Sequence, residues 1–123
     1  MTLQKLRFHH VGIPTSRRLP DNDYQPALKR SDSGYFDNPY GIEWHNFDDD
    51  NPLPELIKTM PHVAFAVDDL RQALHGKEVV LAPTSPADGV TVAFILDNGA
   101  LVELLQFDRP ESEIWPHPGK FEL

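Results

Sequence analysis

Apolar and polar residues follow a regular pattern in the second half of the chain. Four segments are rich in β-branched and aromatic residues, as strands are: residues 62–67, 78–84, 90–97 and 100–107. Apolar residues recur at helical spacing over residues 70–74, with Asp68 or Asp69 as the N-cap and Gly76 as the stop. The pair Asn98-Gly99 favours a hairpin. The second half therefore predicts the order strand–helix–strand–strand–strand.

The first half is less regular and predicts shorter elements. Residues 6–14 and 40–47 have alternating or aromatic-rich patterns that favour strands, and a further strand is expected over Gln25–Arg30. Residues 14–39 are rich in proline, glycine, asparagine and aspartate, so no helix of useful length is expected there. One helical turn is expected over residues 53–60.

The two halves share features in the same order, which indicates an internal duplication. His10 in the segment HHVGIP aligns with His62 in PHVAFA. Glu43 in PYGIEWHNF aligns with Glu103 in GALVELLQF. Each half would therefore begin on a strand that carries a histidine and end on a strand that carries a glutamate.

Strand geometry predicts which of these side chains line a cavity. Alternate residues of a strand point to opposite faces, so His62 shares its face with two small alanines. In the first strand, Phe8 and His10 are expected on one face and His9 on the other. Glu103 lies on an otherwise apolar face of the last strand. Because an unpaired buried carboxylate is costly, we expect a metal ion or another cation beside it.

Composition and charge narrow the classes of function. The 123 residues suit one domain, and their formal charge of −8 disfavours nucleic-acid binding. The chain has no cysteine, which excludes disulfides, iron–sulfur clusters, thiolate zinc sites and cysteine nucleophiles. No apolar run reaches membrane length and no signal-type apolar segment opens the chain, so we expect a cytoplasmic protein that does not bind membranes.

Two imidazoles and two carboxylates form the candidate site. His10, Glu43, His62 and Glu103 would suit a divalent Zn, Ni, Co, Mn or Fe ion and would leave positions open for water or substrate. His45 shares a face with Glu43, so it could replace Glu43 as a ligand, hydrogen-bond to a ligand, or transfer a proton. No nucleophile elbow, phosphate loop or dinucleotide fingerprint is present.

The segments FHHVGIPT, PHVAFAVDDL and GALVELLQF resemble the vicinal oxygen chelate superfamily, the glyoxalase/bleomycin-resistance/dioxygenase group. The resemblance implies an α+β fold of paired βαβββ modules that form a curled mixed sheet around a cavity. One domain, 1–123, would hold a first module at about 5–48 that lacks its helix, a second module at about 61–107, and a C-terminal tail at 108–123. It also implies that the four candidate residues are the metal ligands.

The same resemblance implies a metal-dependent enzyme of the glyoxalase I-type lyase, isomerase or epimerase class, acting on a small molecule. The metal would chelate two neighbouring substrate oxygens, and Glu103 or Glu43 would be the catalytic carboxylate that moves a proton. Two alternatives stay open. One is an extradiol-type Fe(II) dioxygenase that uses His10, His62 and Glu103, and the other is a metal-free small-molecule binding protein of the same fold. A homodimer is also expected.

Overall fold

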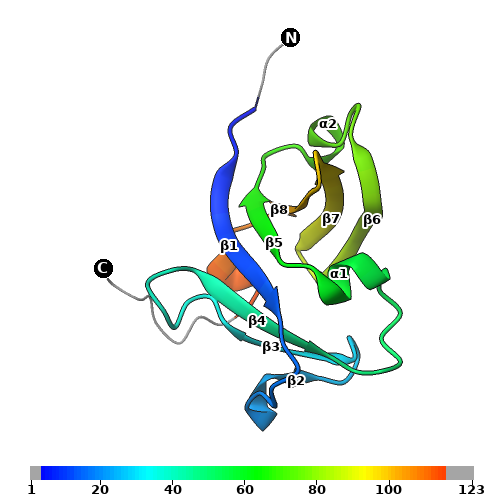
Figure 1. The fold of residues 1–123 in the computed structure, drawn as a ribbon. Helices are drawn as coiled ribbons and strands as arrows, with labels where there is room; N and C mark the ends of the chain where they lie inside the picture. The colour runs from blue at the N-terminus through cyan, green and yellow to red at the C-terminus, as the bar shows by residue number, and fades with distance from the viewer. Residues whose placement is uncertain (1–3, 116–123) are drawn as a thin grey trace.

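The strands of both halves join in one curled mixed sheet of eight strands (Figure 1). The structure is a computed structural model and describes residues 4–115. The first half contributes β1 (Arg7–Pro14), the 3₁₀ helix η1 (Asp21–Asp23), β2 (Tyr24–Gln25), β3 (Arg30–Gly34), β4 (Ile42–Phe47) and α1 (Glu55–Thr59). The second half contributes β5 (His62–Ala66), α2 (Leu70–Ala73), β6 (Glu78–Ala87), β7 (Val90–Asp97), β8 (Ala100–Phe107) and the 3₁₀ helix η2 (Glu111–Glu113).

The strand order brings the first strands of the two halves together at the centre of the sheet. The order is β2-β3-β4-β1-β5-β8-β7-β6. β1 pairs with β5 in antiparallel fashion, with β4 in parallel, and β5 pairs in parallel with β8. The remaining neighbours are antiparallel. The four central strands are therefore the ones that carry the predicted histidines and glutamates.

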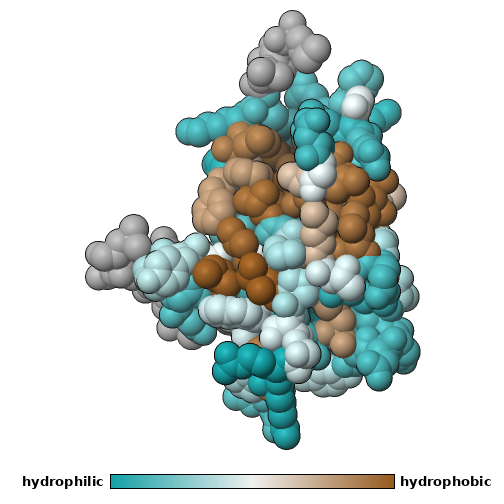
Figure 2. Space-filling model, in the orientation of Figure 1, coloured by the Kyte–Doolittle hydropathy of each residue, from teal (hydrophilic) through white to brown (hydrophobic). Residues whose placement is uncertain are grey.

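The predicted α+β fold built on a curled mixed sheet is confirmed. The two α-helices are short, and between residues 14 and 39 the only helical element is η1, as the composition of that stretch predicts. Within residues 4–115, no helix is both long and apolar enough to span a membrane. On the face shown in Figure 2, apolar residues gather over the strands of the second half, and hydrophilic residues surround β2.

The core lies on both faces of the second-half strands. The outer face of β8 meets α2 in a cluster of buried residues: Val67, Leu70, Ala93, Ile95 and Leu104. On the inner face, Ile57 of α1 packs with Phe94 and Leu101. A third cluster joins Ala64 and Leu105 to partly buried residues that include Trp115 of the C-terminal segment. The helix α1 and the C-terminal segment therefore both contribute to the concave side of the sheet.

The prediction of one strand over Gln25–Arg30 is wrong, because this segment turns. Tyr24–Gln25 and Arg30–Gly34 form an antiparallel pair, and Gln25 lies opposite Arg30. Pro26 has no backbone N–H for a ladder, and Lys29 has a positive φ of 55°, which is typical of a turn. The segment is therefore a hairpin that extends the sheet beyond β4.

A β-bulge in β1 also corrects the predicted faces of that strand. Phe8 pairs with Phe65 and His10 pairs with Ala64, so one residue in β1 is extra between two consecutive positions in β5. Phe8 therefore lies on the outer face, where it is 55% exposed and its ring meets that of Phe65 edge to face. His10 is 3% exposed on the inner face, so the expectation that it shares a face with Phe8 is wrong.

Candidate metal centre

The four central strands bring His10, Glu43, His62 and Glu103 into one buried cluster. Glu103 Oε1 lies 3.3 Å from His10 Nε2 and 3.1 Å from His62 Nε2. Glu43 Oε1 lies 3.2 Å from the same His10 nitrogen. The register explains the convergence, because Gly12 of β1 lies opposite both Glu43 and His62, and Ala64 of β5 lies opposite Glu103. All four predicted side chains therefore reach one point, although they come from distant parts of the sequence.

His45 belongs to the same cluster and has the geometry of a ligand. Its Nε2 lies 3.6 Å from Glu43 Oε1. His10, His45 and His62 each offer a ring nitrogen, and these three nitrogens lie within 4.8 Å of one another. The ring of His45 also stacks on that of His62, with centroids 5.4 Å apart. Three buried histidines are therefore close enough to bind one metal ion.

The ring nitrogens that face this point have no hydrogen-bond partner. Among the described residues, four buried side-chain nitrogens are in this state: His10 Nε2, His45 Nε2 and both ring nitrogens of His62. The three Nε2 atoms lie 3.1–3.6 Å from carboxylate oxygens of Glu43 or Glu103, at ion-pair distance but outside hydrogen-bond geometry. A buried polar atom without a partner costs about 1–3 kcal/mol, so four in one cluster point to a partner that protein atoms do not supply. An imidazole lone pair is a common metal ligand.

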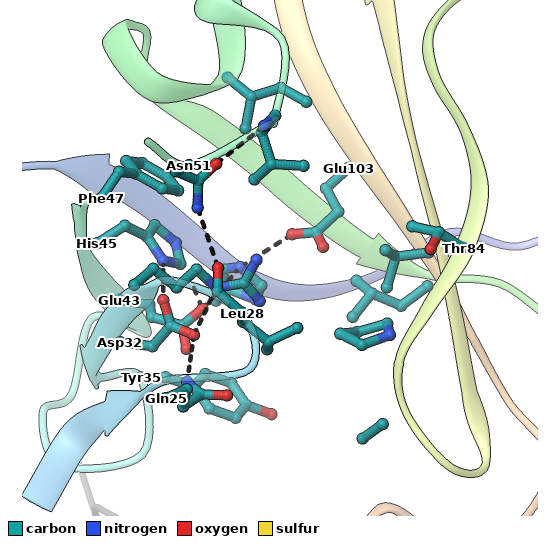
Figure 3. A pocket seen from close by; sticks show the side chains of 18 of the residues that line it. Gln25, Leu28, Asp32, Tyr35, Glu43, His45, Phe47, Asn51, Thr84 and Glu103 are labelled. Carbon is teal, nitrogen blue, oxygen red and sulfur yellow. Dashed lines mark hydrogen bonds and ion pairs between the residues drawn. The ribbon is translucent and has the colours of Figure 1, made fainter. Parts of the chain in front are cut away.

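Asp32 on β3 holds the ring of His45 in place. Its Oδ1 lies 2.6 Å from His45 Nδ1, while Gln25 Nε2 and Arg30 Nε donate to its Oδ2 at 2.6 and 2.9 Å (Figure 3). Burial alone raises the pKa of Asp32, but the hydrogen bond with His45 and the charge of Arg30 outweigh it and lower the pKa to about 2. The ionised carboxylate accepts the proton of Nδ1, which leaves Nε2 with a lone pair for a metal.

Sequence reasoning missed Asp32 as a site residue. It lies in the stretch RSDSG, whose composition indicates a turn, although it forms β3. The signal in the sequence was that Arg30 and Asp32, two residues apart, would point to the same face of a strand. These two residues lie opposite Phe47 and His45 on the antiparallel neighbour β4, so their side chains share the inner face. The residues His9, Tyr35 and Glu111 were also missed: His9 contacts the ring of His10, and Tyr35 and Glu111 both contact His9.

The carboxylates of the site are under opposing electrostatic influences. Burial, together with the charges of Asp32 and Glu103, raises the pKa of Glu43 well above its usual value. Burial also raises the pKa of Glu103, but His10 and His62 outweigh this effect and hold it well below the usual value. Burial lowers the pKa of His10. Burial and the two neighbouring carboxylates therefore disfavour the charged form of Glu43, whereas a divalent cation in the cluster would favour it and leave the carboxylate able to accept a proton.

The cluster lies on the wall of a cavity of about 530 Å³. Figure 3 shows His45, Glu43 and Asp32 on one side and Glu103 pointing toward them from the other. Away from the cluster, the wall is largely apolar and includes Leu28, Phe47, Leu53, Leu81, Phe94 and Trp115. A cavity of this size, with a few convergent polar groups and an apolar wall, suits a small organic molecule.

Comparison with known proteins identifies no relative of this chain. No protein-family model matches the sequence, and a search of curated proteins finds no significant match. The kind of ion is therefore indicated by the chemistry of the ligand atoms. Three imidazole nitrogens and a carboxylate are borderline ligands that fit Zn, Ni, Co, Mn or Fe(II), whereas Ca²⁺ and Mg²⁺ prefer oxygen ligands alone.

Proposed function

We propose that this chain is a metal-dependent enzyme that acts on a small molecule with two neighbouring oxygens, as glyoxalase-type lyases and isomerases do. The observation that carries the proposal is the set of three buried Nε2 atoms, from His10, His45 and His62, that face one point without partners. Glu103 Oε1 lies 3.1 and 3.3 Å from two of these atoms, compared with 3.2 and 3.6 Å for Glu43 Oε1, and Glu103 would be the fourth ligand. His45 thus takes the ligand position that the sequence assigned to Glu43.

The topology supports the resemblance to the vicinal oxygen chelate superfamily. Reading outward from the centre, the first half gives β1, β4, β3 and β2, and the second half gives β5, β8, β7 and β6. The two series use equivalent strands in the same order, and each has one parallel pair next to the centre. We propose that residues 5–48 and 61–107 are paired βαβββ modules, the first without its helix, in a single domain over 1–123 with the tail at 108–123.

Glu43 is the group best placed to move a proton. Its side chain is 23% exposed, compared with 12% for Glu103, so it is the more open of the two carboxylates to the cavity that both line. A bound divalent ion would act as a Lewis acid that polarises the chelated oxygens and acidifies the adjacent C–H. Glu43 would take that proton and return it at a neighbouring position. The apolar wall would bind the rest of the substrate and exclude water.

Two experiments test the proposal. Protein stripped with a chelator is reloaded with Zn, Ni, Co, Mn or Fe(II), and the bound metal is quantified. His75→Ala is the control, because His75 is exposed and follows α2, which packs on the outer face of the sheet. We expect one ion per chain in both proteins. No stoichiometric binding of any of these ions would contradict the proposal and favour a metal-free binding protein.

The second experiment separates the enzymatic alternatives. Loaded protein is incubated in D₂O with a panel of 2-hydroxy ketones, 2-hydroxy acids, hemithioacetals and catechols, and NMR follows deuterium incorporation and product formation. We expect exchange of a C–H next to a carbonyl, without any need for oxygen, and its loss in Glu43→Gln. Turnover of catechols that requires both Fe(II) and oxygen would instead identify an extradiol-type dioxygenase.

A further inference from the structure

The two adjacent histidines of β1 contact each other through their rings. His9 Nδ1 lies 2.6 Å from His10 Nδ1, and the ring centroids are 4.9 Å apart. The contact exists because of the β-bulge, since strict alternation would place these two rings on opposite faces. In a hydrogen bond between two imidazole nitrogens, one nitrogen donates and the other accepts. The proton therefore belongs to one of the two Nδ1 atoms, and the surroundings of His9 decide which.

The other nitrogen of His9 faces a carboxylate from the C-terminal segment. His9 Nε2 lies 3.0 and 2.9 Å from the two oxygens of Glu111, which belongs to η2. Tyr35 Oη and Trp115 Nε1 also donate to Glu111, with shortest distances of 3.1 and 2.9 Å. Burial raises the pKa of Glu111, but its contacts with His9, Trp115 and Tyr35 outweigh this and lower it. Tyr35 Oη also lies 2.8 Å from His9 Nε2, but it donates its single proton to Glu111 and can therefore accept from Nε2. An ionised Glu111 only accepts hydrogen bonds, and a lone pair on His9 Nε2 would face both of its oxygens at 2.9 and 3.0 Å, so the proton of His9 belongs on Nε2.

This arrangement fixes the tautomers of both rings. A His9 ring that holds one proton, on Nε2, has a lone pair on Nδ1. His10 Nδ1 must then donate to that lone pair, so His10 carries its proton on Nδ1 and its lone pair on Nε2. Nε2 is the atom that faces Glu43 and Glu103 at 3.2 and 3.3 Å. Asp32 imposes the same tautomer on His45 through one hydrogen bond, whereas Glu111 acts on His10 through two hydrogen bonds, by way of His9.

The backbone indicates that this network is built into the fold. Tyr35, whose ring stacks on that of His9 at a centroid distance of 4.4 Å, has a positive φ of 67°. A bulky residue in this region is strained and persists only where its surroundings hold it. Here the ring contacts with His9 and the hydrogen bond to Glu111 hold it. The side chain of His9 is 8% exposed, so water does not replace these partners.

We propose that His9, held by Glu111, is a positioning residue that keeps His10 in the tautomer that presents Nε2 to the metal. This inference rests on the proposed metal centre. It assigns a role to the segment after β8, because Glu111 of η2 contacts His9 and thereby fixes the tautomer of His10, a ligand from the first half. Partners of this kind change metal affinity by about 10–100-fold.

The test compares three full-length variants with wild type. His9→Asn keeps an oxygen close to the position of Nδ1 that can accept from His10, whereas His9→Phe keeps a ring but removes the acceptor. His75→Phe is the matched control for loss of a histidine at an exposed site. Long-range ¹H–¹⁵N NMR of the metal-free proteins reports the His10 tautomer directly, and competition titration with Co(II) gives the metal affinity. Thermal unfolding checks that each variant is folded.

We expect His10 to carry its proton on Nδ1 in wild type, His9→Asn and His75→Phe. In His9→Phe we expect Nε2 protonation and Co(II) binding weaker by about 10–100-fold, with His9→Asn restoring affinity to near wild type. Wild-type His10 protonated on Nε2, or wild-type affinity and tautomer in His9→Phe, would overturn the inference. If wild type binds no Co(II), the proposed metal centre fails, but the tautomer measurement still decides the positioning role.

Discussion

Substituting Gly12 with alanine should dislodge a metal ligand without unfolding the protein. Gly12 lies on β1 directly opposite His62 on β5. A Cβ at this position would overlap the ring, since His62 Nδ1 would be only 2.7 Å away and two other ring atoms would be closer. Ordinary contacts between such atoms begin near 3.5 Å, so the ring must retreat by about 1 Å or more.

A retreat of this size is incompatible with coordination. Metal–ligand distances tolerate only about 0.2 Å, so a shift of about 1 Å removes His62 from the site. Structural zinc sites bind with about 10–16 kcal/mol, which over four ligands is roughly 3 kcal/mol per ligand. We therefore expect the Kd for Zn²⁺ to rise by about 100-fold. The ring cannot swing away freely, because Phe94 and His45 pack against it with centroids at 5.0 and 5.4 Å. We expect an added loss of about 1–3 kcal/mol in unfolding free energy.

The assay is a competition titration with Zn²⁺, combined with urea unfolding of the metal-free protein. Gly76→Ala is the matched control, because Gly76 has a positive φ of 75° and open space around it. That substitution should cost about 1–2 kcal/mol of stability, because a Cβ disfavours a positive φ, and should leave the Kd unchanged. Wild-type affinity in Gly12→Ala would refute the reasoning, since His62 could then not be a ligand in the position described.

Three further predictions address the supporting residue, the carboxylates and the core. Asp32→Asn should lower the unfolding free energy by about 2 kcal/mol at neutral pH, because the pKa of Asp32 is lowered from 3.8 to about 2 in the folded protein. This stabilisation is present above about pH 4 and is lost as the pH falls toward 2, so a pH-independent difference in urea unfolding would contradict the prediction. Glu103→Gln should weaken metal binding by about 100-fold in a Co(II) titration, while Glu43→Gln should stay within about tenfold of wild type, and equal losses would argue that Glu43 is a ligand too. Leu104→Ala should lower the unfolding free energy by roughly 3 kcal/mol in urea unfolding but leave the metal Kd unchanged. The reason is that Leu104 is 3% exposed and packs on the face of β8 opposite Glu103, and a large change in Kd would contradict this assignment of faces.

The second half of the chain could be predicted because its local signals agree. Apolar alternation, a capped helix and the Asn98-Gly99 pair all indicate the same elements. In the structure Asp69 Oδ1 accepts from Gln72 N at the helix start, and Asn98 and Gly99 have the positive φ angles of 50° and 83° that a tight hairpin needs. The positions of His62 and Glu103 on the inner face follow from the same alternation.

The first half could be predicted only in part because its structure depends on distant contacts. The stretch around Asp32 forms a strand by pairing with β4, against the turn preference of its serine and aspartate residues. The β-bulge in β1 inserts one residue that no local pattern announces, and it decides that the ring of His9 meets that of His10. Glu111 is 102 residues from His9 in sequence, so no local spacing connects them.

Anomalous X-ray diffraction from crystals of the zinc-loaded protein tests the metal centre most directly. Data collected on both sides of the zinc absorption edge distinguish zinc from water and from other ions. We predict one peak per chain, about 2.0–2.1 Å from Nε2 of each of His10, His45 and His62, with a carboxylate oxygen of Glu103 at a similar distance. A map with no peak between these side chains, or with zinc bound only at surface residues, would contradict the account.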